Sequence, residues 1–344
     1  MKKHGSRSRK VSQPVLWNRR NILRTLLAAN VGVALNGLFP GCAAGMPVAD
    51  VFIGKAVDYN AEIASLIREG LKELGVSAEE IRGKRILLKA NIVEPYAGLE
   101  HIVTNPAVVI AAAEAFSALG AEEIVVAEGS GHCRDTYRIL DESGFDRVIG
   151  NPKITFVDLN YDAWWIAPNA GMRTYLSSFY LPATLKQVDW IVSMPKLKTH
   201  HWAGVTLSMK NLFGVLPGSF YGWPKNVLHM EGIIDSIFDL NATVKPHFAI
   251  VDGIVGMEGD GPIMGSAKAA GIIVMGRNLP AVDDTCARCM GINPGKIKYL
   301  ADAADQRLGP VRESRIRQRG ESWKSVRTDF QLLDFIEDQR GLRL

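Results

Sequence analysis

The sequence reads RILLKANIV at residues 85–93, NPAVVIAAAEAFSAL at residues 105–119 and EIVVA at residues 123–127. The first and third segments are short apolar runs typical of buried strands, and the middle segment has the length and composition of a helix. Asn105 suits the N-cap of that helix and Pro106 suits its first position. Two parallel strands need a crossover connection, usually a helix, so this stretch predicts a parallel sheet.

The same alternation continues on both sides of this unit. Further strands are predicted at residues 51–57, 154–159, 175–181, 189–193, 247–252 and 269–275, and further helices at 61–74, 135–143, 205–213, 230–240 and 279–291. We therefore expect an α/β fold, a mostly parallel sheet with helices on both faces in three layers, over residues 50–305. Residues 306–344 are dense in charge and are predicted to form a peripheral C-terminal extension with one helix near residues 330–336.

The composition is that of an ordinary globular protein, with 47% hydrophobic and 22% charged side chains among 344 residues. It excludes a disordered chain, a collagen and a disulfide miniprotein. The net charge of +4 arises at the N-terminus, which has eight basic residues and no acidic one before Asp50. The remainder has 32 basic against 36 acidic residues, a net of −4, so a basic surface for nucleic acid is not predicted.

Residues 1–45 have the layout of an export signal. A basic region ends in NRRNILR at residues 18–24, and an uncharged apolar run follows at residues 25–39. The paired arginines resemble the twin-arginine motif, which implies the twin-arginine translocation machinery as a partner and a periplasmic or otherwise exported protein. The alternative is a basic tail followed by a membrane anchor.

Cys42 lies in FPGC, which resembles a lipoprotein box, so lipidation of Cys42 is one expectation. The alternative is cleavage near residues 43–45, which leaves a soluble periplasmic protein. In either case we expect contact with the membrane only through the signal or a lipid anchor.

Cys286 and Cys289 have the C-x-x-C spacing of redox and metal sites. No second pair completes a zinc ribbon, and no four-cysteine run supports an iron–sulfur cluster. Because the pair lies in a predicted helix, we interpret it as two buried structural thiols. A disulfide and an electron-transfer role are the alternatives.

The most unusual window is residues 190–230, which contains four lysines, three histidines and neither Asp nor Glu. At the average acid frequency of the chain, about four acidic residues are expected there. Lys196, Lys198 and His200 alternate just past a predicted strand, where ligands of open α/β sheets bind, and Lys210 and Asn211 follow. We predict that these residues bind an anion, against the alternative of separate solvated lysines.

Two other strand ends carry polar groups. Lys89 and Asn91 lie at the end of the strand at residues 85–93, and Ser130 lies in the EGSGH turn after residues 123–127. The glycines beside Ser130 allow close backbone approach, and free amides there would bind an anion. A plain strand–helix turn is the alternative for this segment.

Residues 252–265 form a glycine-rich stretch that carries Asp252, Glu258 and Asp260. Carboxylates on a flexible loop can hold a divalent metal, so these three are the candidate metal ligands, and Asp252 and Glu258 are also candidates for acid/base catalysis. Turn formation alone is the alternative.

His229 is a candidate proton carrier; the alternative is that it is a structural histidine. Residues 218–224 form an aromatic segment, which indicates either a mobile lid over a ligand or a loop that packs against the sheet.

At these segments the chain resembles the domain-of-unknown-function 362 family. The resemblance rests on five motifs in order: residues 89–93, 194–201, 207–214, 251–262 and 281–284. It implies the fold and the motif positions, but no established reaction. Some relatives carry ferredoxin-type cysteine runs; this chain has none, so their iron–sulfur label is not carried over.

Two classes of function follow. The first is an exported enzyme that binds a small anionic ligand, a carboxylate or a phosphate, with a divalent metal as the candidate cofactor. The second is a non-catalytic periplasmic binding protein or a lipoprotein that carries a cofactor or metal. Co-purified ligand and metal, and turnover in variants of Lys198 and Asp252, distinguish the two.

Overall fold

The strand–helix–strand unit predicted from residues 85–127 forms in the computed structural model, which describes residues 48–344. It comprises β2 (Arg85–Lys89), α4 (Pro106–Ala118) and β3 (Glu123–Glu128). The Asn105 side chain caps α4 by accepting from the Ala107 amide at 2.9 Å. Strands β2 and β3 pair in parallel, as the crossover requires.

The central sheet has ten strands within residues 48–344, in the order β12-β1-β11-β10-β7-β2-β3-β4, with β8 paired to β10 and β9 paired to β8. Their bounds are β1 (Ala49–Lys55), β4 (Ile154–Asp158), β7 (Trp190–Ser193), β8 (Lys196–His200), β9 (Gly204–Thr206), β10 (Phe248–Glu258), β11 (Ser266–Gly276) and β12 (Ile316–Gly320). A separate hairpin pairs β5 (Trp164–Pro168) with β6 (Ser178–Pro182). Six pairs in the central sheet are parallel and three antiparallel, which confirms a mostly parallel sheet.

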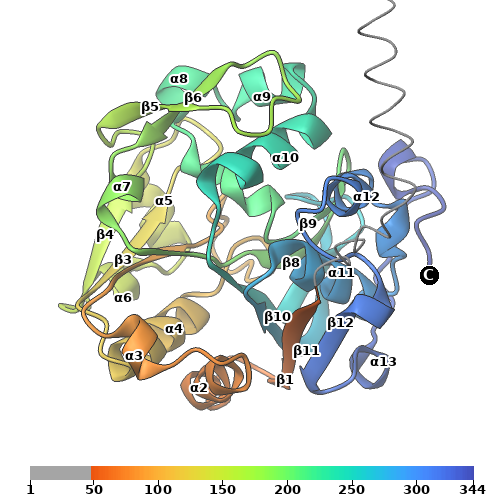
Figure 1. Ribbon diagram of the computed structural model, residues 1–344, viewed down its shortest axis with the longest axis horizontal. Coiled ribbons are helices and arrows are strands. Elements are labelled where there is room, and N and C mark those ends of the chain that lie inside the picture. Colours follow the sequence, from red (N-terminus) through yellow and green to blue (C-terminus); the bar gives the residue numbers. More distant parts are fainter. Residues whose placement is uncertain (1–47) are drawn as a thin grey trace, which may run out of the picture. The chain divides into compact units, whose positions relative to one another are not determined.

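Helices cover both faces of this sheet (Figure 1). One face packs on α2 (Ile63–Glu73), α3 (Ala78–Ile81), α4, α5 (Thr136–Glu142) and α6 (Asp146–Ile149). The other packs on α8 (Gly218–Tyr221), α9 (Asn226–Met230), α10 (Ile233–Val244), α11 (Leu279–Cys289), α12 (Lys298–Asp305) and α13 (Trp323–Val326). Ile86 and Leu88 belong to the first core and Leu87 to the second, because successive strand residues face opposite sides. The predicted three-layer α/β fold is confirmed.

Two element predictions were wrong at the site. The helix expected at residues 205–213 is replaced by β9 and a short 3₁₀ helix, η1 (Lys210–Val215). Strand β10 continues to Glu258, so the first half of the glycine stretch is sheet rather than flexible loop. Gly256 is needed in that strand because a Cβ there would lie 2.7 Å from the Leu197 carbonyl oxygen.

The C-terminal residues are joined to the sheet. Strand β12 pairs in parallel with β1, and Phe330 is fully buried in the core formed with α11. The helix expected near residues 330–336 does not form; residues 330–333 are irregular, and the 3₁₀ turn η4 spans Glu337–Gln339. Apolar burial of Phe330 therefore anchors a segment that its charge density led us to treat as peripheral.

The export signal predicted for residues 1–45 and the lipidation of Cys42 lie outside the described residues. Within residues 48–344, no helix combines the length and apolar character that crossing a membrane requires.

Candidate functional site

A cavity of about 460 Å³ lies at the carboxyl ends of β2, β3 and β8. Its polar lining comes from the end of β3, from the segments after β2, β3 and β10, from β8, β9 and the turn between them, and from η1 and the start and body of α9. Those polar residues are Asn91, Glu94, Glu128, His132, Lys198, His200, His201, Thr206, Lys210, Asn211, Lys225, His229 and Asp260. The position is the one that ligands occupy in open α/β sheets.

Lys198 lies on β8 and is fully buried. Its ammonium donates to two carbonyl oxygens, those of Ile102 at 2.8 Å and Pro262 at 3.2 Å. No carboxylate among residues 48–344 lies within ion-pair distance of it, and burial together with the neighbouring Lys196 and Lys210 charges holds the pKa of Lys198 well below its ordinary value. An anion in the cavity would therefore be a strong partner for the protonated form.

Two further lysines line the cavity. Burial lowers the pKa of Lys210 to about 7, and its ammonium lies 3.7 Å from the centre of the Phe213 ring. Burial also lowers the pKa of Lys225 to about 8, and Lys225 donates to the Asn160 amide oxygen at 2.7 Å. Lys225 has a left-handed backbone with φ of 69°, a strained conformation that clusters at functional sites.

The two central imidazoles have opposite hydrogen-bonding roles. His200 Nδ1 accepts from the Trp202 amide at 2.9 Å, so in the neutral ring Nε2 carries the proton and is a donor. His229 Nδ1 lies 3.0 Å from the Lys225 carbonyl oxygen, which only accepts, so its Nε2 is left as an acceptor. Burial lowers the pKa of both residues, well below the ordinary value for His200. The cavity thus holds one neutral donor imidazole and one neutral acceptor imidazole.

Each acid that lines the cavity already has a basic partner. Glu128 pairs with Lys89 at 2.8 Å, Glu94 with Arg134 at 3.0 Å, and Asp260 with His201 at 3.4 Å. None of these carboxylates forms an ion pair with Lys198, Lys210 or Lys225. The arrangement favours a negatively charged ligand.

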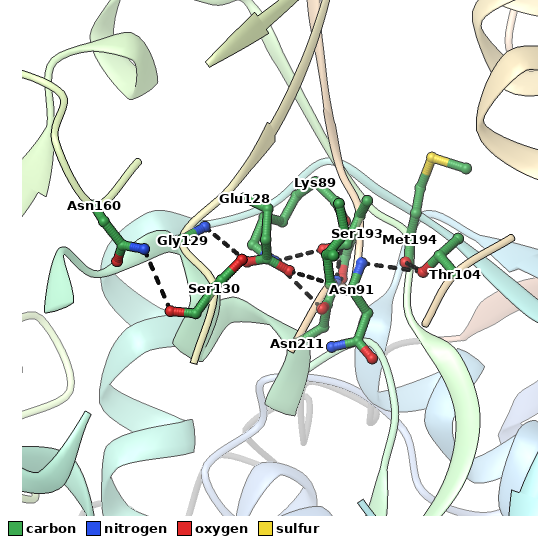
Figure 2. A network of polar contacts seen from close by, with 12 residues as sticks. Lys89, Asn91, Thr104, Glu128, Gly129, Ser130, Asn160, Ser193, Met194 and Asn211 are labelled. Atoms are coloured by element: carbon green, nitrogen blue, oxygen red, sulfur yellow. Dashed lines mark hydrogen bonds and ion pairs between the residues drawn. The ribbon is translucent and has the colours of Figure 1, made fainter. Parts of the chain in front are cut away.

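Three buried polar atoms at the cavity have no hydrogen-bond partner within residues 48–344: Asn91 Oδ1, Thr206 Oγ1 and Glu94 Oε2, the second oxygen of the carboxylate that pairs with Arg134 through Oε1. In Figure 2 the Asn91 side chain turns away from the Lys89–Glu128 ion pair and carries no contact, whereas its backbone amide donates to Thr104 at 3.0 Å. Buried polar groups are normally paired, so an unpartnered amide and hydroxyl at one cavity indicate a site for polar ligand atoms or water.

The family model for the domain of unknown function DUF362 matches residues 86–288, which include every residue that lines the cavity. The chain belongs to the DUF362 family. It is 25% identical over 271 residues to a thylakoid-associated protein of Synechocystis sp., and the match covers 76% of this chain and 80% of that protein.

Two solved structures are similar at low identity. The lactate racemase apoprotein of Thermoanaerobacterium thermosaccharolyticum has 11% identity and a TM-score of 0.37, with 62% of this chain and 51% of that chain covered. A Thermotoga maritima protein has 14% identity and a TM-score of 0.39, with 68% and 59% covered. The chain thus spans between half and three-fifths of the length of these structures.

Within the DUF362 match, the cavity brings together a majority of the predicted site residues. Those that line it are Asn91, Lys198, His200, Lys210, Asn211, His229 and Asp260; those that do not are Lys89, Ser130, Lys196, Asp252 and Glu258. Of the second group, Lys89 lies directly behind the wall, where it pairs with Glu128 and donates to the Ala90 carbonyl at 2.6 Å. Gly214 makes room for this pair, since a Cβ there would lie 2.0 Å from Glu128 Oε1.

Lys196 and Asp252 form a second, closed ion pair. The ammonium lies 2.6 Å from Asp252 Oδ2 and donates to the Tyr59 hydroxyl at 2.8 Å, and both charged side chains are fully buried. Asp252 also accepts from Tyr59 and from the Asn105 amide. The expectation that Lys196 faces an anion and that Asp252 is an acid/base residue is therefore wrong, because each already has its counter-charge.

The predicted metal site does not form. Asp252 is closed off by Lys196, Glu258 pairs with Lys268 at 3.3 Å and accepts from the Gln331 amide, and Asp260 faces His201. Among residues 48–344 no three His, Cys, Asp or Glu side chains are grouped so that they could hold a metal ion. The extension of β10 to Glu258 places Asp252 and Glu258 apart on one strand, and Glu258 does not line the cavity.

The two glycine amides of the turn after β3 already have acceptors. The Gly129 amide donates to the Gly214 carbonyl at 2.8 Å, and the Gly131 amide donates to the Val93 carbonyl at 3.2 Å. Ser130 is buried, and its carbonyl accepts from Asn160 at 3.3 Å. The two glycine amides therefore serve the structure of the turn; Ser130 does not line the cavity, and its role in anion binding stays a prediction.

Cys286 and Cys289 lie buried in α11 as free thiols. Burial raises the pKa of both, to about 12 for Cys289, so they stay protonated and unreactive at neutral pH.

The aromatic segment at residues 218–224 contains Tyr221, which is buried in α8. Its hydroxyl accepts from the Tyr180 amide at 2.9 Å, as the packing alternative predicted.

Sequence reasoning left Lys225, His201 and Thr206 out of the site. The signal for Lys225 and His201 was present, because both lie in the acid-free window at residues 190–230. Thr206 gave no signal, since nothing in the sequence shows that its hydroxyl is left unpaired.

Proposed function

We propose that this DUF362 protein binds a small anionic molecule, a carboxylate or a phosphate, in the cavity between β2, β3 and β8, and acts on it as an enzyme. The observation that carries the proposal is a group of three lysines that have no carboxylate partner among the described residues. Lys198, Lys210 and Lys225 line one cavity whose carboxylates are each paired with another basic group. The unpartnered Asn91 and Thr206 atoms support a polar ligand.

The two imidazoles supply the chemistry for the enzymatic part of the proposal. His229 Nε2 can accept a proton from the ligand, and His200 Nε2–H can donate to an oxygen that gains negative charge. The nearby lysines favour such an oxyanion. A proton transfer on a ligand held by its acidic group is the reaction class that these residues fit.

Binding is tested by calorimetric titration of the purified protein with sulfate, phosphate and acetate at pH 7. Lys198→Met should weaken binding at least tenfold, since it removes a fully buried cation at the cavity. Lys72→Met is the matched control, because Lys72 is exposed on α2. Equal affinities of both variants, or no binding of any anion by the native protein, would overturn the proposal.

Catalysis is tested on ligands that co-purify with the protein and are identified by native mass spectrometry. Turnover that is lost in His229→Gln while binding persists supports an enzyme. Tight binding with no turnover by the native protein identifies a non-catalytic carrier instead.

We further propose export through the twin-arginine pathway, on the basis of Arg19 and Arg20 before the uncharged apolar run. Cell fractionation of the native chain and of the Arg19→Lys, Arg20→Lys double variant tests this. Retention of the double variant in the cytoplasm, with the native chain outside it, is the expected result; equal fractionation of the two would refute export by this route. Mass spectrometry of the exported form decides whether Cys42 is lipidated.

A further inference from the structure

Part of the cavity wall is apolar. Three separate loops contribute to it: Val93 and Tyr96 follow β2, Trp202 lies between β8 and β9, and residues 262–264 connect β10 to β11. Residues 262–264 add Pro262, Ile263 and Met264. An inorganic anion needs only the cationic side, so this wall requires a separate explanation.

Trp202 is the central feature of the apolar wall. It is 53% exposed although it lines a cavity, and Tyr96 and Met264 beside the same cavity are 49% and 78% exposed. Three large apolar side chains around one opening form a surface that gains from being covered, because burying apolar area is favourable. An indole face is also a good stacking platform for a flat ring.

The Trp202 ring is held in place by edge contacts. Its centroid lies 4.5 Å from His201 and 5.3 Å from His229, both at steep interplanar angles. The Trp202 backbone amide is fixed by its bond to His200 Nδ1. The ring thus borders His229, one of the two central imidazoles, and its backbone is bonded to the other, His200, so the apolar and the charged parts of the cavity adjoin.

The volume leaves room for both parts of a ligand. A cavity of about 460 Å³ falls within the range of about 300–1,000 Å³ that holds drug-sized organic molecules. A lone phosphate or acetate would fill only a small part of it and leave the apolar wall exposed.

Building on the proposed function, we infer that the ligand is an aromatic acid, a flat ring that stacks on Trp202 while its carboxylate or phosphate lies among Lys198, Lys210 and His200. The anionic group supplies the charge that the lysines lack, and the ring covers the exposed indole. Specificity then comes from the ring and its distance from the acid group.

The test compares matched pairs of anions by titration at pH 7: acetate with benzoate and 2-naphthoate, and phosphate with phenyl phosphate. Each aryl acid should bind at least tenfold more tightly than its small counterpart. Trp202→Ala should remove most of this gain and leave acetate and phosphate affinities within twofold. Trp202→Phe, which keeps a ring, should retain part of the gain, and cyclohexanecarboxylate should fall below benzoate.

Trp164→Ala is the control, because Trp164 is about equally exposed but lies on β5 and does not line the cavity. The inference is overturned if small anions bind through Lys198 but an added ring gains less than twofold, or if Trp202→Ala retains the gain. Failure of small and aryl anions alike would instead overturn the proposed function itself. The carboxylate and phosphate series show which acid group the site prefers.

Discussion

Lys89, Lys196, Lys198, Lys210 and Lys225 divide into two groups. Lys89 and Lys196 each contact one buried carboxylate, Glu128 and Asp252, at 2.8 and 2.6 Å. Lys198 has only carbonyl oxygens as partners, and like Lys210 and Lys225 it lines the cavity.

The difference shows that burial of a lysine does not by itself mark a ligand site. A buried ion pair is complete, and it fixes the strands that carry it, here β2 with β3 and β8 with β10. A buried lysine without a counter-charge is costly for the empty protein and favourable only once an anion arrives. The first group is therefore structural, and the second is the group to which we assign ligand binding.

Removing one half of a closed pair should have the largest effect on stability. Asp252→Ala leaves Lys196 buried without its carboxylate and also removes the acceptor for Tyr59 and the Asn105 amide. We expect the free energy of unfolding to fall by about 3–5 kcal/mol, measured by urea denaturation. Replacing both partners, Lys196→Met with Asp252→Leu, should recover much of this loss, because no unpaired charge remains.

The control for this variant is Asp305→Ala, since Asp305 is exposed at the end of α12. It should change the stability by less than about 0.5 kcal/mol. An Asp252→Ala protein as stable as the Asp305→Ala protein would remove the distinction between the two lysine groups.

The second group should reveal itself through pH. Because the pKa of Lys210 is about 7 in the folded protein and its ordinary value is 10.5, the unfolded chain holds a proton between these values that the folded chain has lost. The stability of the empty protein should therefore rise as the pH increases from about 7 towards 10. Lys210→Met should reduce this rise and leave the contributions of the other buried lysines, among them Lys198 and Lys225.

Anion binding should show the opposite pH trend. Sulfate does not titrate in this range and prefers protonated lysines, so its affinity should fall as the pH rises from 7 to 9, with proton uptake on binding at the upper end. Calorimetry in two buffers of different ionisation enthalpy measures that uptake. A sulfate affinity that is independent of pH in the native protein would contradict the assignment of Lys210 and Lys225.

The fold was predictable because its signals are local. The apolar runs of β2 and β3 and the Asn105–Pro106 start of α4 specify the crossover without distant information. Local signals also gave a wrong prediction for residues 252–258. The glycines there suggested a flexible loop, but Gly256 allows close packing against β8. A glycine count does not reveal which neighbour will approach it.

The site was predictable only in part, because pairing is a property of distant residues. The acid-free window at residues 190–230 correctly drew attention to Lys198, His200 and Lys210, which meet at the cavity. It gave the same weight to Lys196, whose partner lies 56 residues away and outside the window. The roles of the histidines were equally hidden, since backbone groups decide which ring nitrogen carries the proton.

The smallest effect should come from the partly exposed pair of Glu258 and Lys268, which lie 3.3 Å apart. Solvent screens such pairs, and each is worth less than about 1 kcal/mol. Glu258→Gln keeps an oxygen that can accept from the Gln331 amide, so we expect stability to change by less than about 1 kcal/mol and sulfate affinity to stay within twofold. Urea denaturation and titration of the same preparation measure both. A large loss of affinity would mean that Glu258 acts at the cavity from a distance, and the division of charged residues by their contacts would then be too simple.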